Sequence, residues 1–318
     1  MTRGPRAHGS PVRLMSAAPP RSGPLQAAIE ALARALAYPA VAGTGAEAGI
    51  AAVYSERITR DLTVGEARLL ESITETRERG LALCRAGRIH AGATLIARAR
   101  ATLTRADIGE EAFVLSDSFL CAGEGFVHFK SDRPDAAVSS MFEAIDRCRD
   151  LRDAWGYPVE GRRIHLACNA TRVRAGAGRH EESPVVLAQL LNLIATSDRR
   201  FWPYPDLEYL SAPDPLGDDA RWELTDQVLA IVSRLAPEVL GRVTAALPSH
   251  PPGHEPHPLA ARARCFTEAI RAHASGDFEA FLSLCAEFAP PGPRHLPRAA
   301  RHLAERLPLK AVTGTARR

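Results

Sequence analysis

The sequence predicts an all-α protein made of stacked antiparallel helical hairpins. Apolar residues recur at helical spacing along almost the whole chain. Ala and Leu dominate the apolar residues and aromatic residues make up only 6% of the chain, a composition that favours helices over strands. No segment alternates apolar and polar residues between turn signals, so we expect no sheet.

The 318-residue chain is expected to form one helical-repeat domain between two tails. Residues 1–24 contain five prolines, four arginines and no acidic residue, which predicts a disordered basic tail. An organelle transit peptide is the alternative for this segment. Residues 25–310 would form the domain, and residues 311–318 a second disordered tail.

The first two expected helices would form an atypical N-terminal hairpin, residues 25–62, that caps the array. Apolar residues from Leu25 to Leu36 lie on one face of a helix that Pro39 ends. The apolar residues between Ile50 and Ile58 indicate a second helix.

The segment 63–196 carries the clearest helix boundaries. Thr63 and Glu66 form a T-x-x-E capping box at the start of a helix that Gly87 ends. Asp107 repeats this start signal for a helix that runs to about residue 130. Asp132, followed by Pro134 in a first turn, marks the start of another helix. Further helices are expected at 157–176, 183–196, 219–235, 237–247, 258–274, 277–289 and 297–306.

Two stretches interrupt the helical periodicity. Residues 197–218 are rich in Pro, Asp and aromatic residues and are expected to form an aromatic, acidic loop. Residues 248–258 form a Pro/His-rich loop that cannot be helical. The C-terminal helices of the domain therefore fall within residues 219–310.

A set of residues with fixed internal offsets recurs in four places. A small residue is followed by a turn residue after seven positions, a second small residue after five more, and apolar residues four and three further on. The first three sets are spaced by 45 and 46 residues. The four sets are Gly80, Gly87, Gly92, Ile96 and Ala99; Gly125, Asp132, Ala137, Met141 and Ala144; Thr171, Gly178, Ser183, Leu187 and Leu190; and Ala269, Gly276, Phe281, Cys285 and Phe288.

This pattern resembles that of tetratricopeptide repeats over residues 64–196 and, with fewer matches, over 258–290. The resemblance implies that small residues lie where paired helices approach closely and that Gly ends the first helix of each pair. It also implies a concave groove, lined by the first helices, that holds an extended peptide or a partner helix. The family repeat spans about 34 residues, so these hairpins would have longer helices or linkers. A generic helical bundle is the alternative.

Charge and cysteine usage exclude several classes of protein. The net charge is +3, but both ends of the chain are basic and the middle is acidic, unlike the basic folded face of a nucleic-acid-binding protein. Six cysteines show no CxxC spacing and lie in apolar helical patterns, typical of small buried hydrophobic residues. Without an apolar run of 18 residues or a signal peptide, we expect a cytoplasmic protein with no membrane or nucleic-acid partner.

The candidate binding residues are five aromatic residues in the segment 201–222. Trp and Tyr often anchor binding, because they combine a large apolar surface with a hydrogen-bonding group. Neighbouring carboxylates suit a basic partner. The alternative is that the segment folds back and packs on the protein itself. The predicted partner-binding residues are Phe201, Trp202, Tyr204, Tyr209 and Trp222.

Two groups of metal-ligand residue types occur, and neither predicts a metal site. Asp218, Asp219 and Glu223 spell DDxxxE, similar to the aspartate-rich motif of helical terpene synthases, but no partner motif follows. The Asp pair fits a helix N-cap and first turn.

The second group, His250, His254 and His257, lies in the Pro-rich loop, where no helix fixes ligands on one face. We therefore predict no catalytic residue, metal or cofactor.

The predicted function is protein–protein interaction, as an adaptor, scaffold or sensor module that binds a partner protein or peptide. The groove and the aromatic 201–222 segment would form the binding surface. The alternative is an all-helical enzyme or small-molecule-binding protein, with residues 197–223 as a lid over an interhelical pocket. A deep cavity with convergent titratable groups would favour this alternative.

Overall fold

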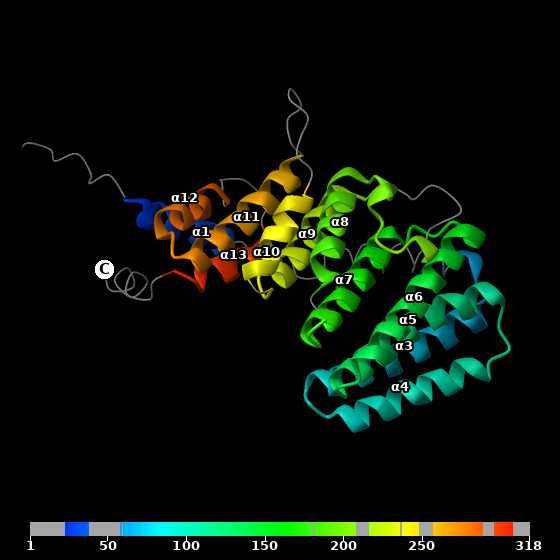
Figure 1. Ribbon diagram of the computed structural model, residues 1–318. Coiled ribbons are helices and arrows are strands. Elements are labelled where there is room, and N and C mark those ends of the chain that lie inside the picture. The colour runs from blue at the N-terminus through cyan, green and yellow to red at the C-terminus, as the bar shows by residue number, and fades with distance from the viewer. Residues whose placement is uncertain are drawn as a thin grey trace, which may run out of the picture.

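The computed structural model describes residues 23–37, 58, 60–179, 181–207, 216–235, 237–247, 257–288 and 296–307. Within these ranges the chain is helical and contains no strand, which confirms the all-α prediction (Figure 1). The α-helices are α1 (Pro24–Ala37), α3 (Val64–Arg85), α4 (Ile89–Thr104), α5 (Glu110–Lys130), α6 (Pro134–Trp155), α7 (Glu160–Gly176), α8 (Ser183–Thr196), α9 (Asp218–Val232), α10 (Pro237–Ala246), α11 (Pro258–Ser275), α12 (Phe278–Phe288) and α13 (Pro297–Ala304). Two 3-10 helices, η1 (Arg199–Phe201) and η2 (Pro205–Leu207), lie between α8 and α9.

The predicted capping box forms at the start of α3. Thr63 Oγ1 accepts a hydrogen bond from the Glu66 amide at 3.2 Å, and the Glu66 carboxylate accepts one from the Thr63 amide at 2.9 Å. Glu66 also accepts the Gly109 amide at 2.8 Å. The first turn of α3 is thereby joined to the N-cap residue of α5, two helices further along the chain.

Consecutive helices pack side by side from α3 to α8 (Figure 1). The contacts of α3 with α4, of α5 with α6, and of α6 with α7 are extensive, and α3 also contacts α5. Short turns join α3 to α4, α5 to α6, α7 to α8 and α11 to α12. The residues with a left-handed backbone in these turns are Gly87, Asp132, Gly178 and Gly276, with φ angles of 79°, 57°, 80° and 79°.

Small residues allow the paired helices to approach very closely. A Cβ atom on Gly92 of α4 would lie 2.3 Å from Cys84 Sγ and 2.6 Å from the Gly80 carbonyl oxygen of α3. A Cβ atom on Gly125 of α5 would lie 3.1 Å from the Ala137 carbonyl oxygen of α6. The backbones of α3 and α4 therefore touch, and no larger residue fits at Gly92 without moving the helices apart.

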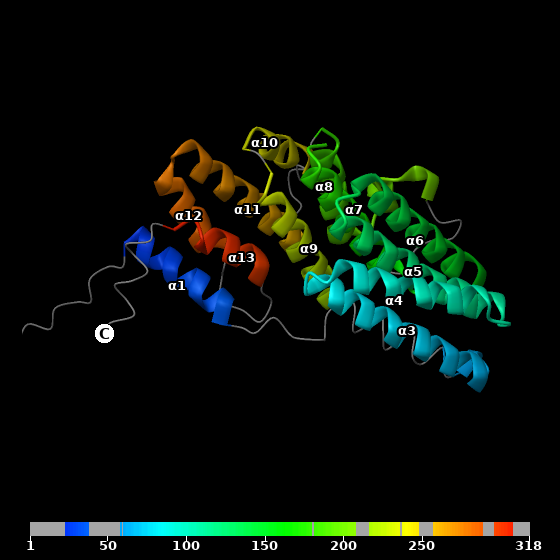
Figure 2. The same cartoon turned by 90° about the horizontal axis from the view of Figure 1, so that it is seen from below.

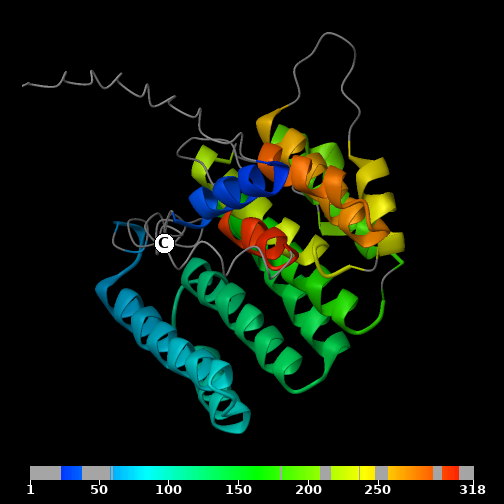
Figure 3. The same cartoon turned by 90° about the vertical axis from the view of Figure 1, so that its left-hand side faces the viewer.

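Helix α1 does not pack where the sequence predicted. We expected it in a hairpin, residues 25–62, that caps the first repeat. The structure instead packs α1 against α12 and α13, as Figures 2 and 3 show. The buried face of α1 is rich in Ala, and α13 presents Ala299, Ala300 and Leu303, so small side chains on both helices permit this close packing. Residues 38–57, the other half of the expected hairpin, lie outside the described residues.

A buried carboxylate joins the three helices α4, α5 and α6. Asp117 of α5 accepts hydrogen bonds from Arg100 of α4 and from Arg147 of α6, the latter at 2.7 Å. Burial alone would raise the pKa of Asp117, but the hydrogen bonds from the two arginines outweigh it and lower the pKa. Asp117 is therefore a charged link between neighbouring helix pairs.

The C-terminal helix α13 is held by a second buried carboxylate. Asp226 of α9 accepts the backbone amides of Arg298 and Ala299 at 3.0 and 2.9 Å, at the first turn of α13. Burial raises the pKa of Asp226 to about 6. Asp226, a titratable group, therefore holds the first turn of α13 in place, and α1 packs on this helix.

The cysteines and the helix lengths agree with the sequence. All six cysteines are buried and free, as predicted for small apolar residues. None of the helices in the described ranges is long and apolar enough to cross a membrane.

We expect Gly92→Ala to lower the free energy of unfolding by about 1–3 kcal/mol, because the added methyl group would overlap Cys84 Sγ and the Gly80 backbone. Gly241→Ala in α10 is the matched control, since a Cβ atom there meets no atom within 4 Å. Helix propensity predicts that this control is neutral or stabilising. Urea unfolding of both variants measures the difference, and equal stabilities would contradict the close contact.

We expect the stability contribution of Asp226 to depend on pH. The folded pKa lies above the ordinary value of 3.8, so the stabilisation is fully present below about pH 4 and is lost as the pH rises through about 6. Asp226→Asn removes this titration, and the variant should gain up to about 3 kcal/mol relative to wild type between pH 4 and pH 7. Urea unfolding at both pH values measures the change, and a difference independent of pH would refute it.

Candidate functional site

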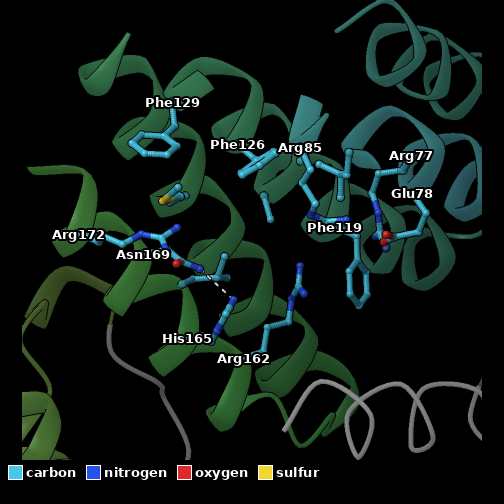
Figure 4. A pocket seen from close by; sticks show the side chains of 15 residues that line it. Arg77, Glu78, Arg85, Phe119, Phe126, Phe129, Arg162, His165, Asn169 and Arg172 are labelled. Atoms are coloured by element: carbon cyan, nitrogen blue, oxygen red, sulfur yellow. Dashed lines mark hydrogen bonds and ion pairs between the residues drawn. The ribbon is translucent and has the colours of Figure 1, made fainter. Parts of the chain in front are cut away.

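A cavity of about 380 Å³ opens along α3, α5 and α7, the first helices of three successive helix pairs (Figure 4). Helix α5 lies in the middle and contributes Phe119, Ala122, Gly123, Phe126 and Phe129. Helix α3 forms one wall and α7 the other. The cavity is therefore built almost wholly from one helix of each pair.

The lining residues recur at equal offsets from the small residue of each sequence set. This small residue is Gly80 in α3, Gly125 in α5 and Thr171 in α7, and all three are buried. Residues at the same offset face the cavity because the three helices pack in the same orientation relative to their partners. Leu81, Phe126 and Arg172 follow the small residue by one position, and Glu78, Gly123 and Asn169 precede it by two.

One end of the cavity holds two arginines against one aromatic ring. The guanidinium carbon of Arg77 lies 4.7 Å from the centre of the Phe119 ring, and that of Arg162 lies 3.7 Å from it. Arg162 also donates a hydrogen bond to the Ser118 carbonyl at 3.0 Å. Cation–π contacts of this kind are favourable and hold the guanidinium groups in place.

The other end of the cavity repeats this arrangement with different rings. The guanidinium carbon of Arg85 lies 5.8 Å from the Phe126 ring centre, and that of Arg172 lies 5.8 Å from the Phe129 ring centre. Lys130 Nζ lies 5.6 Å from the Phe126 ring centre. Each end of the cavity therefore combines aromatic and cationic side chains.

A chain of hydrogen bonds orients a polar group in the middle of the cavity. The amide nitrogen of Asn169 lies 2.9 Å from His165 Nε2, and His165 Nδ1 lies 2.7 Å from Gln227 Oε1 in α9. Gln227 in turn donates to Glu223 at 3.3 Å. Since the Gln227 oxygen accepts, His165 carries its proton on Nδ1 and Nε2 accepts from Asn169. Asn169 is thus held with its carbonyl oxygen directed away from His165.

The predicted binding residues pack on the protein itself. Trp202 is 5% exposed, donates from Nε1 to the Tyr204 carbonyl at 2.7 Å, and lies under the Arg163 guanidinium at 4.0 Å. The ring of Tyr204 contacts that of Phe142 in α6, with centroids 4.9 Å apart. This placement fits the alternative that the segment folds back.

The other members of the predicted set lie outside the cavity or outside the described chain. Phe201 and Trp222 pack partly buried against the main core. Tyr209 lies outside the described residues. No described residue of 197–223 lines this cavity.

Arg163 explains why the aromatic segment folds back. It is 1% exposed, lies 3.2 Å from Glu160, and donates to the carbonyl of Leu207 in η2. A buried guanidinium needs acceptors and a flat surface to compensate for lost hydration. The segment supplies both, with a carbonyl oxygen and the Trp202 ring.

The other candidate ligand groups do not form a metal site in the described ranges, where no cluster of His, Cys, Asp and Glu could hold an ion. Asp218 and Asp219 form the first turn of α9, but Gly217 and not an Asp is its N-cap. His257 caps α11 by accepting the Leu259 amide at 3.3 Å. His250 and His254 lie outside the described residues.

Sequence reasoning missed the residues that line the cavity. The fixed offsets located the small residues, and helical spacing from Gly80, Gly125 and Thr171 would have identified their neighbours on the exposed face. The segment 201–222 concentrates its aromatic residues in a short stretch of sequence. The phenylalanines of α5 are spread along a 21-residue helix, so the sequence shows no comparable cluster there.

We expect Trp202→Ala to lower the free energy of unfolding by roughly 3–5 kcal/mol, because it removes a buried ring and the surface on which Arg163 lies. Phe278→Ala is the control, because Phe278 is 53% exposed and should cost less than about 1 kcal/mol. Urea unfolding compares the two. Equal losses would contradict a structural role for Trp202.

Comparison with known proteins gives no match for this chain among protein-family models, curated proteins or solved structures.

Proposed function

We propose that this chain is a peptide-binding interaction module with a tetratricopeptide-repeat-like architecture. In this proposal α3–α4, α5–α6 and α7–α8 are antiparallel hairpins of a short solenoid, and the cavity is the deepest part of its concave groove. The observation that carries the proposal is the recurrence of lining residues at equal offsets on α3, α5 and α7. A repeat array produces this recurrence, because each repeat presents the same helix face to the groove.

Two further observations support the repeat architecture. The turn residue seven positions after each small residue has a positive φ angle in all four sequence sets. The small residues at Gly80 and Gly125 contact the backbone of the following helix, as the resemblance implied. These features set the geometry of a helix pair, and their repetition favours an array over an irregular bundle.

The groove replaces the aromatic segment as the proposed binding surface. Trp202 and Tyr204 pack against side chains of α7 and α6, whereas the phenylalanines of α5 line the cavity. Aromatic and arginine side chains in a concave site are typical anchors for a partner. The partner in this proposal is an extended peptide segment of a cytoplasmic protein.

A small-molecule ligand is the second candidate. The cavity volume of about 380 Å³ falls in the range of ligand pockets, and the oriented Asn169 amide offers a specific polar contact. The cavity is shared by three helices along their length, which favours an elongated ligand.

We expect a substitution that fills the groove to weaken peptide binding. Ala122→Trp places a large ring in the cavity, and Ala97→Trp is the matched control on the exposed side of α4. Decapeptides selected from a phage library on the wild-type protein should bind Ala97→Trp unchanged and Ala122→Trp at least about tenfold more weakly by fluorescence anisotropy. Peptides that bind both variants equally would refute the groove.

A library that yields no peptide would refute the proposed function. A thermal-shift screen with metabolites on the same three proteins then tests the second candidate. A metabolite that stabilises the wild type and Ala97→Trp, but not Ala122→Trp, would support a small-molecule site.

A further inference from the structure

We propose that the groove recognises an acidic peptide in which two carboxylate side chains, about 15 Å apart, flank a short apolar stretch. This inference rests on the proposed peptide-binding function and specifies the chemistry of its ligand.

The groove carries more positive charge than its own carboxylates neutralise. Four arginines line it, two on α3 and two on α7, and Glu78 is the single carboxylate in the lining. Glu78 is paired with Arg77. Within the described residues no carboxylate pairs with Arg85, Arg162 or Arg172, and the Nε atoms of Arg162 and Arg172 have no hydrogen-bond partner.

The surroundings of Arg172 make an anionic partner favourable. Burial lowers the pKa of this guanidinium, and the nearby charges of Arg234 and Arg298 lower it further. A cation that is partly removed from water and placed near other cations is destabilised. A carboxylate that binds there would form charge-assisted hydrogen bonds and offset this cost.

The contrast with the arginines elsewhere in the array is sharp. Arg100 and Arg147 bind the buried Asp117, and Arg163 lies beside Glu160. These side chains are therefore compensated from within the fold. In the groove, Arg85, Arg162 and Arg172 lie beside phenylalanine rings instead, and within the described residues no carboxylate pairs with them.

The positive charge is concentrated at the two ends of the groove. Arg77 and Arg162 lie against Phe119, and Arg85 and Arg172 lie beside Phe126 and Phe129. Phe119 and Phe129 are ten residues apart on α5, which corresponds to about 15 Å along a helix. An extended peptide covers this distance in four or five residues.

The middle of the groove suits a short stretch of peptide with apolar side chains. Leu81, Ala122 and Leu166 supply apolar surface there. The Asn169 amide, oriented by His165, offers an acceptor to a peptide N–H group. Carboxylates at both ends and apolar residues between them therefore match the groove along its length.

A peptide fits these observations better than a single-stranded nucleic acid. Nucleic-acid grooves stack bases on open aromatic faces, but each phenylalanine here already has an arginine or lysine within 6.0 Å of its ring centre. The groove also places its cations at two ends, whereas a nucleic acid carries a phosphate at every nucleotide.

Permuted peptides test the inference. The probes are fluorescein-labelled decapeptides, blocked at both ends and built from Leu, Ala and Ser with two Glu residues two, five or eight positions apart. A fourth probe replaces both Glu residues by Gln, and a fifth replaces them by Lys. The peptide with a separation of five should bind the full chain at least about tenfold more tightly than the Gln and Lys peptides. Its affinity should fall as salt rises.

Variants at the two ends of the groove locate each carboxylate. Arg162→Gln removes a positive charge at one end of the groove. The double variant Arg85→Gln/Arg172→Gln removes two at the other end. Arg98→Gln, on the exposed face of α4, is the matched control. In double-mutant cycles, Glu→Gln at one peptide position should couple to one end and not to the other. Circular dichroism confirms that each variant is folded.

Three outcomes overturn the inference. The first is that Gln or Lys peptides bind as tightly as the Glu peptides, which keeps the peptide-binding function and rejects the acidic ligand. The second is that affinity is insensitive to the groove arginines or to Glu separation. The third is that a labelled RNA decamer binds more tightly than every peptide. If no decapeptide of any charge binds, the proposed function itself fails.

Discussion

Close approach of the backbones of α3 and α4, and of α5 and α6, is the constraint on which the arrangement of the neighbouring helices depends. Gly92 brings α4 against Cys84 and Gly80 of α3, and Gly125 does the same between α5 and α6. Residues on another face of α3, α5 and α7 line one cavity. The small residues on the packed face thus set the orientation in which the neighbouring residues of each helix face this cavity.

Arginine has two roles in this protein, and its surroundings distinguish them. Arg100, Arg147 and Arg163 are bound by carboxylates or carbonyl oxygens, and they connect neighbouring helices or hold the aromatic segment in place. Such bonds are directional, and they fix the order and orientation of the elements they join. Stacked on rings, Arg162 and Arg172 are positioned without being neutralised. The fold thereby keeps charge available in its cavity.

The sequence was sufficient for features that depend on nearby residues. The capping box of Thr63 and Glu66, the positive φ angle at Gly87 and the burial of the six cysteines all follow from local pattern. Features set by distant contacts were missed or misplaced. Helix α1 packs on α13, which is far away in the sequence. Trp202, in a segment whose composition is typical of an exposed loop, is buried beneath Arg163. No periodicity records such pairings, because they depend on which surfaces the rest of the fold leaves open.

The docking of α1 on α12 and α13 has a consequence for biosynthesis. The ribosome makes α1 before α12 and α13, and the surface to which α1 binds is completed only when α13 has emerged, more than 260 residues later. Helices α3 to α7 contact mainly their neighbours in sequence and are able to pack as they emerge. The Ala-rich face of α1 remains without its partner throughout this period. We therefore expect the docking of α1 to be a late step of folding, and a ribosome-bound chaperone that covers α1 until then would protect the nascent protein from aggregation.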